Sequence, residues 1–157
     1  MNRLVNPSKA LRTLRKTPVL LDALLEDVTQ EQAEALHDGD WNAIFVVSHM
    51  RDFEAITAQR VRDLLSRPNP TFAVVSNDEL IRDHNYAAAD LRQVMGEIAR
   101  LRRELITLLE SLADEQWLLA GVHPSQGPAT LLDVAINAGL HDVDHLEQIV
   151  RCLAPLH

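Results

Sequence analysis

The stretch from residue 91 to residue 112 most constrains the fold, because its large apolar residues recur in steps of three and four without a break. These residues are Leu91, Val94, Ile98, Leu101, Leu105, Leu108 and Leu112. Such a period places them along one side of an α-helix. A helix of this kind gains most of its stability when other elements cover its apolar side. The pattern therefore predicts helices packed against helices.

Two further long helices are predicted before this one. The first follows Thr17, which can cap a helix whose first position is Pro18, and a shorter helical piece opening at Pro7 continues its apolar stripe. The second spans about residues 40–66 and ends before two prolines. Both segments are long enough to lie beside the periodic stretch along most of its length.

A fourth helix is predicted over about residues 131–153. Thr130 precedes it as the expected N-cap, and Asp133, three residues on, completes a capping box. Short helical pieces are expected in two connections, 29–40 and 76–83, because each opens with residues that cap helices.

Alternation typical of strands is nearly absent, and the one strand-like stretch, residues 71–77, is short. We therefore expect an all-α protein, an antiparallel four-helix bundle with short extra helical segments in its connections. No linker or repeat divides the chain, so we expect one domain over residues 1–157.

Charge and composition exclude several classes of partner. The formal net charge of −8 argues against nucleic acid, whose ligands present basic surface. The longest apolar runs are about five residues, far too short to span a membrane. Cys152 is the single cysteine, so no disulfide framework exists and a reducing compartment is expected. Without a secretion signal at its start, the chain is expected to be cytoplasmic.

Three histidines lie on the inward faces of two predicted helices. His141 and His145 are four residues apart and share one face of the fourth helix. His49 lies between Phe45 and Phe53 in an apolar column of the second helix, so it should point into the bundle. Three imidazoles would leave a coordination position of a divalent metal open, as in catalytic sites. The alternative is that these histidines are packing residues.

Ligating imidazoles usually donate their second N–H to a carboxylate or carbonyl oxygen. Asp52 lies one turn after His49, and Asp144 and Gln148 lie beside the pair on the fourth helix. These three are the candidate partners. Asp52 has a second candidate role, as a general base for a metal-bound water.

Other residues near the predicted site have simpler interpretations. Cys152 is two turns past His145, about 10 Å along the axis, so it is expected to be a core residue and not a ligand of the same ion. Trp41 is expected to hold the preceding loop against the bundle, and the alternative is that its ring lines the pocket. His84 and Tyr86 lie in a connection that can reach the open end of the bundle.

The order of several motifs resembles the DinB/YfiT-like superfamily of metal-binding four-helix bundles, which is unrelated to the DNA polymerase that shares the DinB name. The motifs are TPVLLDALL, WNAIFVVSHMRDFE, NYAAADL, GVHPSQGPATLLDV and HDVDHLEQI. The resemblance implies a divalent metal, zinc or nickel, held by His49, His141 and His145, and a homodimer.

The resemblance also implies an activity toward small molecules. One expectation is a metal-dependent transferase that uses a low-molecular-weight thiol such as bacillithiol or mycothiol as its co-substrate. A metal-dependent hydrolase, with a water at the three-histidine site and Asp52 as base, is the alternative. A third alternative is a non-catalytic metal-binding protein or dimer scaffold. Fold and ligands transfer well across such a resemblance, whereas substrates do not.

Overall fold

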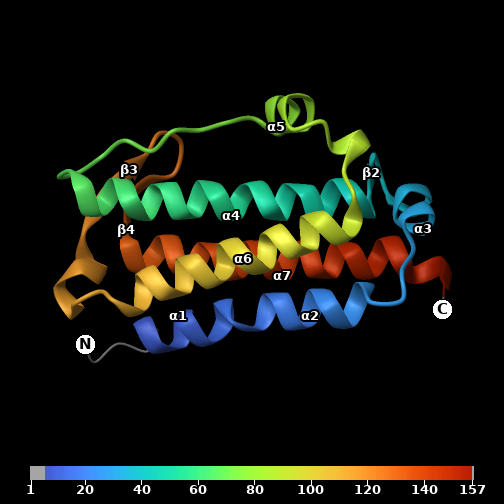
Figure 1. Ribbon diagram of the computed structural model, residues 1–157. Coiled ribbons are helices and arrows are strands. Elements are labelled where there is room, and N and C mark those ends of the chain that lie inside the picture. The colour runs from blue at the N-terminus through green and yellow to red at the C-terminus, as the bar shows by residue number, and fades with distance from the viewer. Residues whose placement is uncertain (1–5, 157) are drawn as a thin grey trace.

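The periodic stretch forms helix α6, Leu91–Glu110, in the computed structural model, which describes residues 6–156. The side chain of Asp90 caps α6 by accepting a hydrogen bond from the backbone N–H of Gln93. Around α6 lie the other long elements of the bundle: α1 (Pro7–Leu14), α2 (Lys16–Leu25), α4 (Ala43–Ser66) and α7 (Leu131–Leu153). The four-helix bundle expected from the sequence is confirmed, with α1 and α2 following each other along one edge (Figure 1).

Figure 1 shows that α4 and α6 run in the same direction, opposite to α7 and to the α1–α2 pair. The reason is the long connection 67–90, which returns over the length of α4 before α6 begins. This connection carries α5 (Asn77–Asp83) and the 3-10 helix η1 (Tyr86–Ala88). α4 packs against both α6 and α7, so it is the central helix of the site described below.

The remaining elements are short and lie in connections, except for one that follows α7. They are α3 (Gln30–Ala35), the 3-10 helices η2 (Asp114–Leu118) and η3 (Ala154–Leu156), and the strands β1 (His37–Asp38), β2 (Trp41–Asn42), β3 (Ala120–His123) and β4 (Gly127–Thr130). β1 pairs with β2, and β3 pairs with β4, each pair antiparallel. No helix of residues 6–156 combines the length and the apolar character that crossing a bilayer requires.

The predicted helix starts are partly right. Thr130 caps α7 in a capping box with Asp133, and Thr29 caps α3 in the same way. Thr17 is not a cap: it is buried inside α2, where Arg102 and Asp142 use its hydroxyl. A threonine directly before a proline is typical of a helix start, which is why Thr17 was predicted to be a cap. The first helix begins earlier, at Pro7.

The second long helix begins later than predicted. Asn42 caps α4 by accepting a hydrogen bond from the backbone N–H of Phe45, and Trp41 belongs to strand β2. Because β1 and β2 pair across a turn at Gly39, where φ is +61°, the chain cannot enter the helix at Asp40. Trp41 is thereby directed toward α7, which matters for the site.

Two hydrophobic clusters fill the bundle, and a buried ionic network lies in the same interior. On α6, Arg102 and Leu109 are buried where the sequence pattern placed Leu101 and Leu108, which are only half-buried. Arg102 is 2% exposed because its guanidinium is bound from several helices. The stripe predicted on α7 is also shifted, since Val143 and Val150 are 56% and 51% exposed.

The ionic network is centred on Arg102. Its guanidinium forms two hydrogen bonds with Glu54 of α4, of 2.8 and 2.6 Å, and one of 2.8 Å with Asp142 of α7. It also donates to the backbone carbonyl of Leu14 and the hydroxyl of Thr17. One side chain of α6 thus joins every other long helix of the bundle, and Asp142 directly follows His141 in the chain.

Candidate metal centre

The three histidines singled out from the sequence meet between α4 and α7. His49 lies in the second turn of α4 and is 7% exposed, while His141 and His145 lie one turn apart on α7 and are half-buried. α4 and α7 pack side by side in opposite directions, which brings the beginning of α4 to the second half of α7. The contact of two long helices therefore positions the site.

The three Nε2 atoms converge. The Nε2 atom of His141 lies 2.9 Å from that of His49 and 3.2 Å from that of His145. Metal–nitrogen bonds of about 2.0–2.1 Å, at angles between about 90° and 109°, separate two ligand nitrogens by roughly 2.9–3.4 Å. Both distances fit pairs of imidazoles bound to one divalent ion, and the ligand nitrogens of all three rings lie within 4.8 Å of one another. Among residues 6–156, no other three His, Cys, Asp or Glu side chains come together in this way.

The protonation states also fit a metal site. Burial, followed by the charge of His145, lowers the pKa of His49 to about 4, against an opposing effect of Asp52. Burial, then the charges of His145, His49 and Arg102, lowers the pKa of His141 to about 3. Burial lowers the pKa of His145 as well. All three rings are therefore neutral at neutral pH, the form that binds a cation.

Aromatic rings form the walls of the site. The ring of Phe53 stacks on that of His141 with centroids 3.6 Å apart, and Trp41 lies parallel to His145 at 6.4 Å. Trp41 also meets His49 edge-on at 5.2 Å. From the sequence, holding the loop in place was the favoured role of Trp41 and lining the pocket was the alternative; the β1–β2 pairing that turns the ring toward the site gave no recognisable signal.

Comparison with known proteins agrees with this arrangement. A model of the DinB superfamily matches residues 13–149. The chain belongs to the DinB superfamily.

Two solved structures share this four-helix bundle fold. YfiT from Bacillus subtilis, described as a probable metal-dependent hydrolase with an unusual four-helix bundle topology, is 20% identical with a TM-score of 0.88, and the match covers 99% of this chain and 93% of that one. TT2238, described as a four-helix bundle protein, is 23% identical with a TM-score of 0.64, over 90% of this chain and 96% of that one. At such identities these likenesses establish the fold. No curated protein matches the chain.

Gln148 is the hydrogen-bond partner of one of the three histidines, His145. Its Oε1 atom accepts a hydrogen bond of 2.8 Å from Nδ1 of His145, which fixes that proton and leaves the lone pair of Nε2 facing the other two rings. Asp144, the other residue expected in this role, makes no such bond. The buried Nδ1 atoms of His49 and His141 have no hydrogen-bond partner among residues 6–156. Among residues 6–156, His145 is therefore the only one of the three rings whose Nδ1 atom is held by a hydrogen bond.

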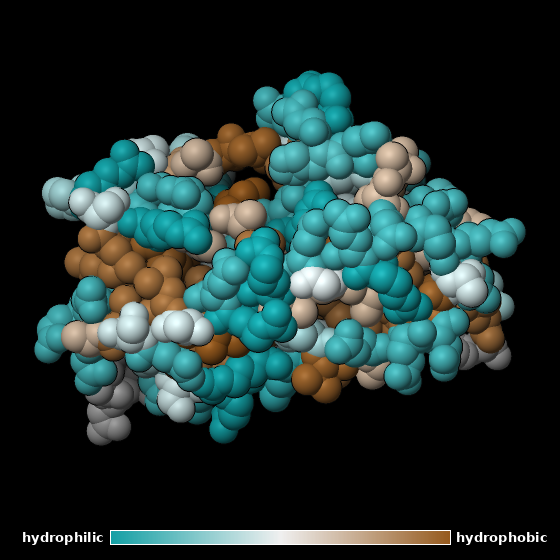
Figure 2. Space-filling model, in the orientation of Figure 1, coloured by the Kyte–Doolittle hydropathy of each residue, from teal (hydrophilic) through white to brown (hydrophobic). Residues whose placement is uncertain are grey.

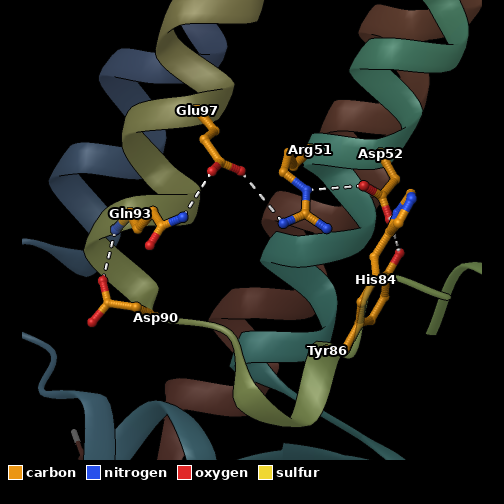
Figure 3. Close-up of polar contacts among 7 residues, drawn as sticks. All are labelled: Arg51, Asp52, His84, Tyr86, Asp90, Gln93 and Glu97. Atoms are coloured by element: carbon orange, nitrogen blue, oxygen red, sulfur yellow. Dashed lines mark hydrogen bonds and ion pairs between the residues drawn. The ribbon is translucent and has the colours of Figure 1, made fainter. Parts of the chain in front are cut away.

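Asp52 lies beside the site and faces another group of residues. Its Oδ2 atom accepts hydrogen bonds of 2.7 Å from both Nδ1 of His84 and the hydroxyl of Tyr86, and its Oδ1 atom accepts one of 2.9 Å from Arg51 (Figure 3). No hydrogen bond joins it to His49; it acts on that ring through its charge, which raises the pKa of His49. Asp52 thus fastens the connection before α6 to α4.

The same contacts place His84 and Tyr86. Both come from the connection after α5 and point toward Asp52, as Figure 3 shows. Burial, and then the hydrogen bond to Asp52, raises the pKa of Tyr86 above its ordinary value, so the phenol is neutral. Glu97 of α6 completes the group through an ion pair of 3.4 Å with Arg51. The group joins α4, α6 and the connection without using any of the three site histidines.

Cys152 lies apart from the three histidines, as the sequence predicts. Its thiol is buried in the cluster between α4 and α7, and its Sγ atom lies 4.0 Å from the backbone carbonyl of Trp41. Burial raises the pKa of this thiol, which makes a thiolate unfavourable there. Cys152 is a packing residue of the bundle core.

Proposed function

We propose that the protein binds a divalent metal through His49, His141 and His145 and transfers a low-molecular-weight thiol to a small-molecule acceptor. The observation that carries the proposal is the convergence of three neutral imidazoles, with Nε2 atoms 2.9 and 3.2 Å apart, without a fourth protein ligand among residues 6–156. Zinc or nickel suits three imidazoles. A bound cation of this kind lowers the pKa of a thiol or water placed at its open position.

Hydrolysis is the second candidate, and the description of YfiT favours it. A hydrolase gains from a general base near the attacking water. Asp52, the expected base, is directed toward other residues: its two oxygens accept hydrogen bonds from Arg51, His84 and Tyr86, and none joins it to His49. A thiol transferase needs no such base. This difference supports the transferase, with Asp52 as a positioning residue.

The side chains around the histidines have separate tasks in the proposal. Gln148 holds the proton of His145 on Nδ1. Phe53 and Trp41 flank the rings and keep bulk water from two sides, which strengthens electrostatic interactions at the open position. The third alternative is a scaffold that binds metal without turnover. It is the interpretation that remains if no thiol reaches the open position.

The test uses protein loaded with cobalt(II), whose absorption reports its ligands. Adding cysteine should produce a thiolate-to-cobalt charge-transfer band in the near ultraviolet, and adding serine should not. An unchanged spectrum with cysteine, in protein shown to hold cobalt, would rule out the transferase. A His145→Ala variant, which lacks one of the three ligands, is the control for cobalt bound elsewhere.

A homodimer is likewise proposed, with α2 and α7 as the interface. Val19 of α2 and Val143 and Val150 of α7 are 67%, 56% and 51% exposed, and the two helices pack beside each other. Val143 and Val150 are seven residues apart and so share one face of α7. Sedimentation velocity tests the assembly: a dimer should dissociate on Val143→Glu, and a wild-type monomer at micromolar concentration contradicts it.

A further inference from the structure

Arg60, on α4, is a half-buried cation without an ion-pair partner among residues 6–156. Its Nε atom is fully buried and makes no hydrogen bond with any described residue. The guanidinium carbon lies 6.0 Å from the ring centroid of Phe53 and 5.6 Å from that of Phe72, so two aromatic faces hold it. Burial lowers the pKa of Arg60. In a chain with a net charge of −8, a half-buried arginine whose buried Nε atom has no partner among residues 6–156 requires an explanation.

Arg60 lines a cavity of about 290 Å³ between α4, α7 and the β3–β4 hairpin. His123, Gln126 and Asn137 also line this cavity. The backbone N–H of Ser125 donates to Nδ1 of His123 at 3.3 Å, so the neutral ring of His123 carries its hydrogen on Nε2. The cavity therefore brings together one fixed cation, a ring N–H and two side-chain amides, all of which can donate to an anion.

A second cavity, of about 370 Å³, shares Arg60 and has the opposite character. It lies beneath the connection that passes over α4, where Figure 2 shows a hollow with hydrophobic residues inside. Asp52, Asp63 and Asp83 line it, and their charges disfavour an anion there. The first cavity has one carboxylate, Asp133, whose Oδ2 atom is already bound by the backbone N–H and hydroxyl of its capping threonine. An anion is therefore favoured in the first cavity.

The first cavity lies close to the metal centre. The ring of Phe53 is 3.6 Å from that of His141 and 6.0 Å from the guanidinium carbon of Arg60, which places that carbon within about 10 Å of the His141 imidazole. Asn137 precedes His141 by one turn of α7, so both lie on one face of the helix. The distance from Arg60 to His141 is short enough for one small molecule to reach Arg60 with one end and the histidines with the other.

We propose that Arg60, assisted by His123 and Asn137, binds a carboxylate of the small molecule that reacts at the three histidines. A guanidinium matches a carboxylate with two parallel hydrogen bonds, and the adjoining donors match the remaining lone pairs. The inference deepens the proposed function and rests on it for the location of the reacting end. It names the substrate class: a molecule with a carboxylate within about 10 Å of its thiol or acceptor group.

The test compares two thiols of the same length on cobalt-loaded protein: mercaptohexanoate, with a carboxylate, and mercaptohexanol, without one. Wild-type protein should bind mercaptohexanoate about tenfold more tightly, the preference expected for charge-assisted hydrogen bonds. Arg60→Gln should abolish this preference and leave the affinity for mercaptohexanol unchanged. Arg60→Lys, which keeps the charge without the planar fork, should restore part of it. Arg62→Gln, an exposed arginine of the same helix, is the matched control.

Equal affinities for the two thiols in wild-type protein, or a preference that survives in Arg60→Gln, would overturn the inference and leave the metal site intact. If neither thiol changes the cobalt spectrum, the proposed function fails instead. Titration of metal-free protein with hexanoate, followed by NMR on the wild type and Arg60→Gln, then decides the anion site by itself. Shifts confined to the residues lining the first cavity and lost in Arg60→Gln support it, and their absence refutes it.

Discussion

Replacing Arg102 by methionine should destabilise the protein severely. The guanidinium makes five hydrogen bonds, three of them to the carboxylates of Glu54 and Asp142, and the three side chains are 2–7% exposed. Methionine fills much of the same volume, so loss of packing is a small part of the effect. The substitution leaves two carboxylates buried without their cation, and breaking a buried ion pair from one side costs about 3–5 kcal/mol.

Thermal and urea unfolding, monitored by circular dichroism, measure this cost. For a chain of this size 1 kcal/mol corresponds to about 2–4 °C, so the melting temperature should fall by roughly 6–20 °C. Burial already raises the pKa of Glu54 in the intact network, partly offset by Arg102. Without Arg102 that pKa rises further above its unfolded value. The deficit should therefore be greatest at neutral pH and shrink as pH falls and the carboxylates take up protons.

Arg103→Met is the matched control, because Arg103 is the exposed neighbour on α6 and its side chain has no ion pair within residues 6–156. Removing all three charges together, by Arg102→Met with Glu54→Leu and Asp142→Leu, should recover most of the lost stability. The reasoning is refuted if Arg102→Met and Arg103→Met unfold within about 0.5 kcal/mol of each other, the ordinary range for surface substitutions. It is also refuted if the deficit of Arg102→Met is independent of pH.

Three further predictions concern the metal centre. Gln148→Leu should weaken metal binding about 10–100-fold, because the proton on Nδ1 of His145 loses its acceptor. Competition with a chelator measures the affinity, and an unchanged value would show that Gln148 does not orient the ring. Metal-free protein should lose stability as pH falls from about 6.5 toward 4, because His49 and His141 take up protons in the unfolded chain but stay neutral when buried in the folded one. Urea unfolding across this range should show a steeper loss in the wild type than in His49→Ala. Asp52→Asn should lower the free energy of unfolding by about 1.5–3 kcal/mol and leave metal content and thiol binding unchanged. A selective loss of turnover with normal thiol binding would instead indicate that Asp52 acts as a base.

The bundle and the meeting of the three histidines follow from periodicity in the sequence. Spacings of three and four residues decide which side of a helix faces inward, and they placed His49 and the pair His141 and His145 toward a shared interface. The structure brings these rings together; their role as ligands stays a prediction. The hydrogen bond between Gln148 and His145 could be predicted for the same reason, since the two residues are three apart on one helix.

Features that depend on contacts between distant segments were not predicted. Arg102 lies next to Leu101 in an apolar pattern, and nothing local shows that Glu54 and Asp142 meet it in the interior. The parallel course of α4 and α6 depends on the path of residues 67–90, whose composition does not determine where they cross. Arg60 had no assigned place because its surroundings come from the connection and the β3–β4 hairpin.

The most direct test of the account is the metal content of purified, tag-free protein by elemental mass spectrometry, beside the triple variant His49→Ala, His141→Ala, His145→Ala. The account predicts about one divalent ion per chain in the wild type and none in the variant. A folded wild-type protein that holds no metal after reconstitution with zinc or nickel would contradict it. The three imidazoles would then be neighbours by packing alone.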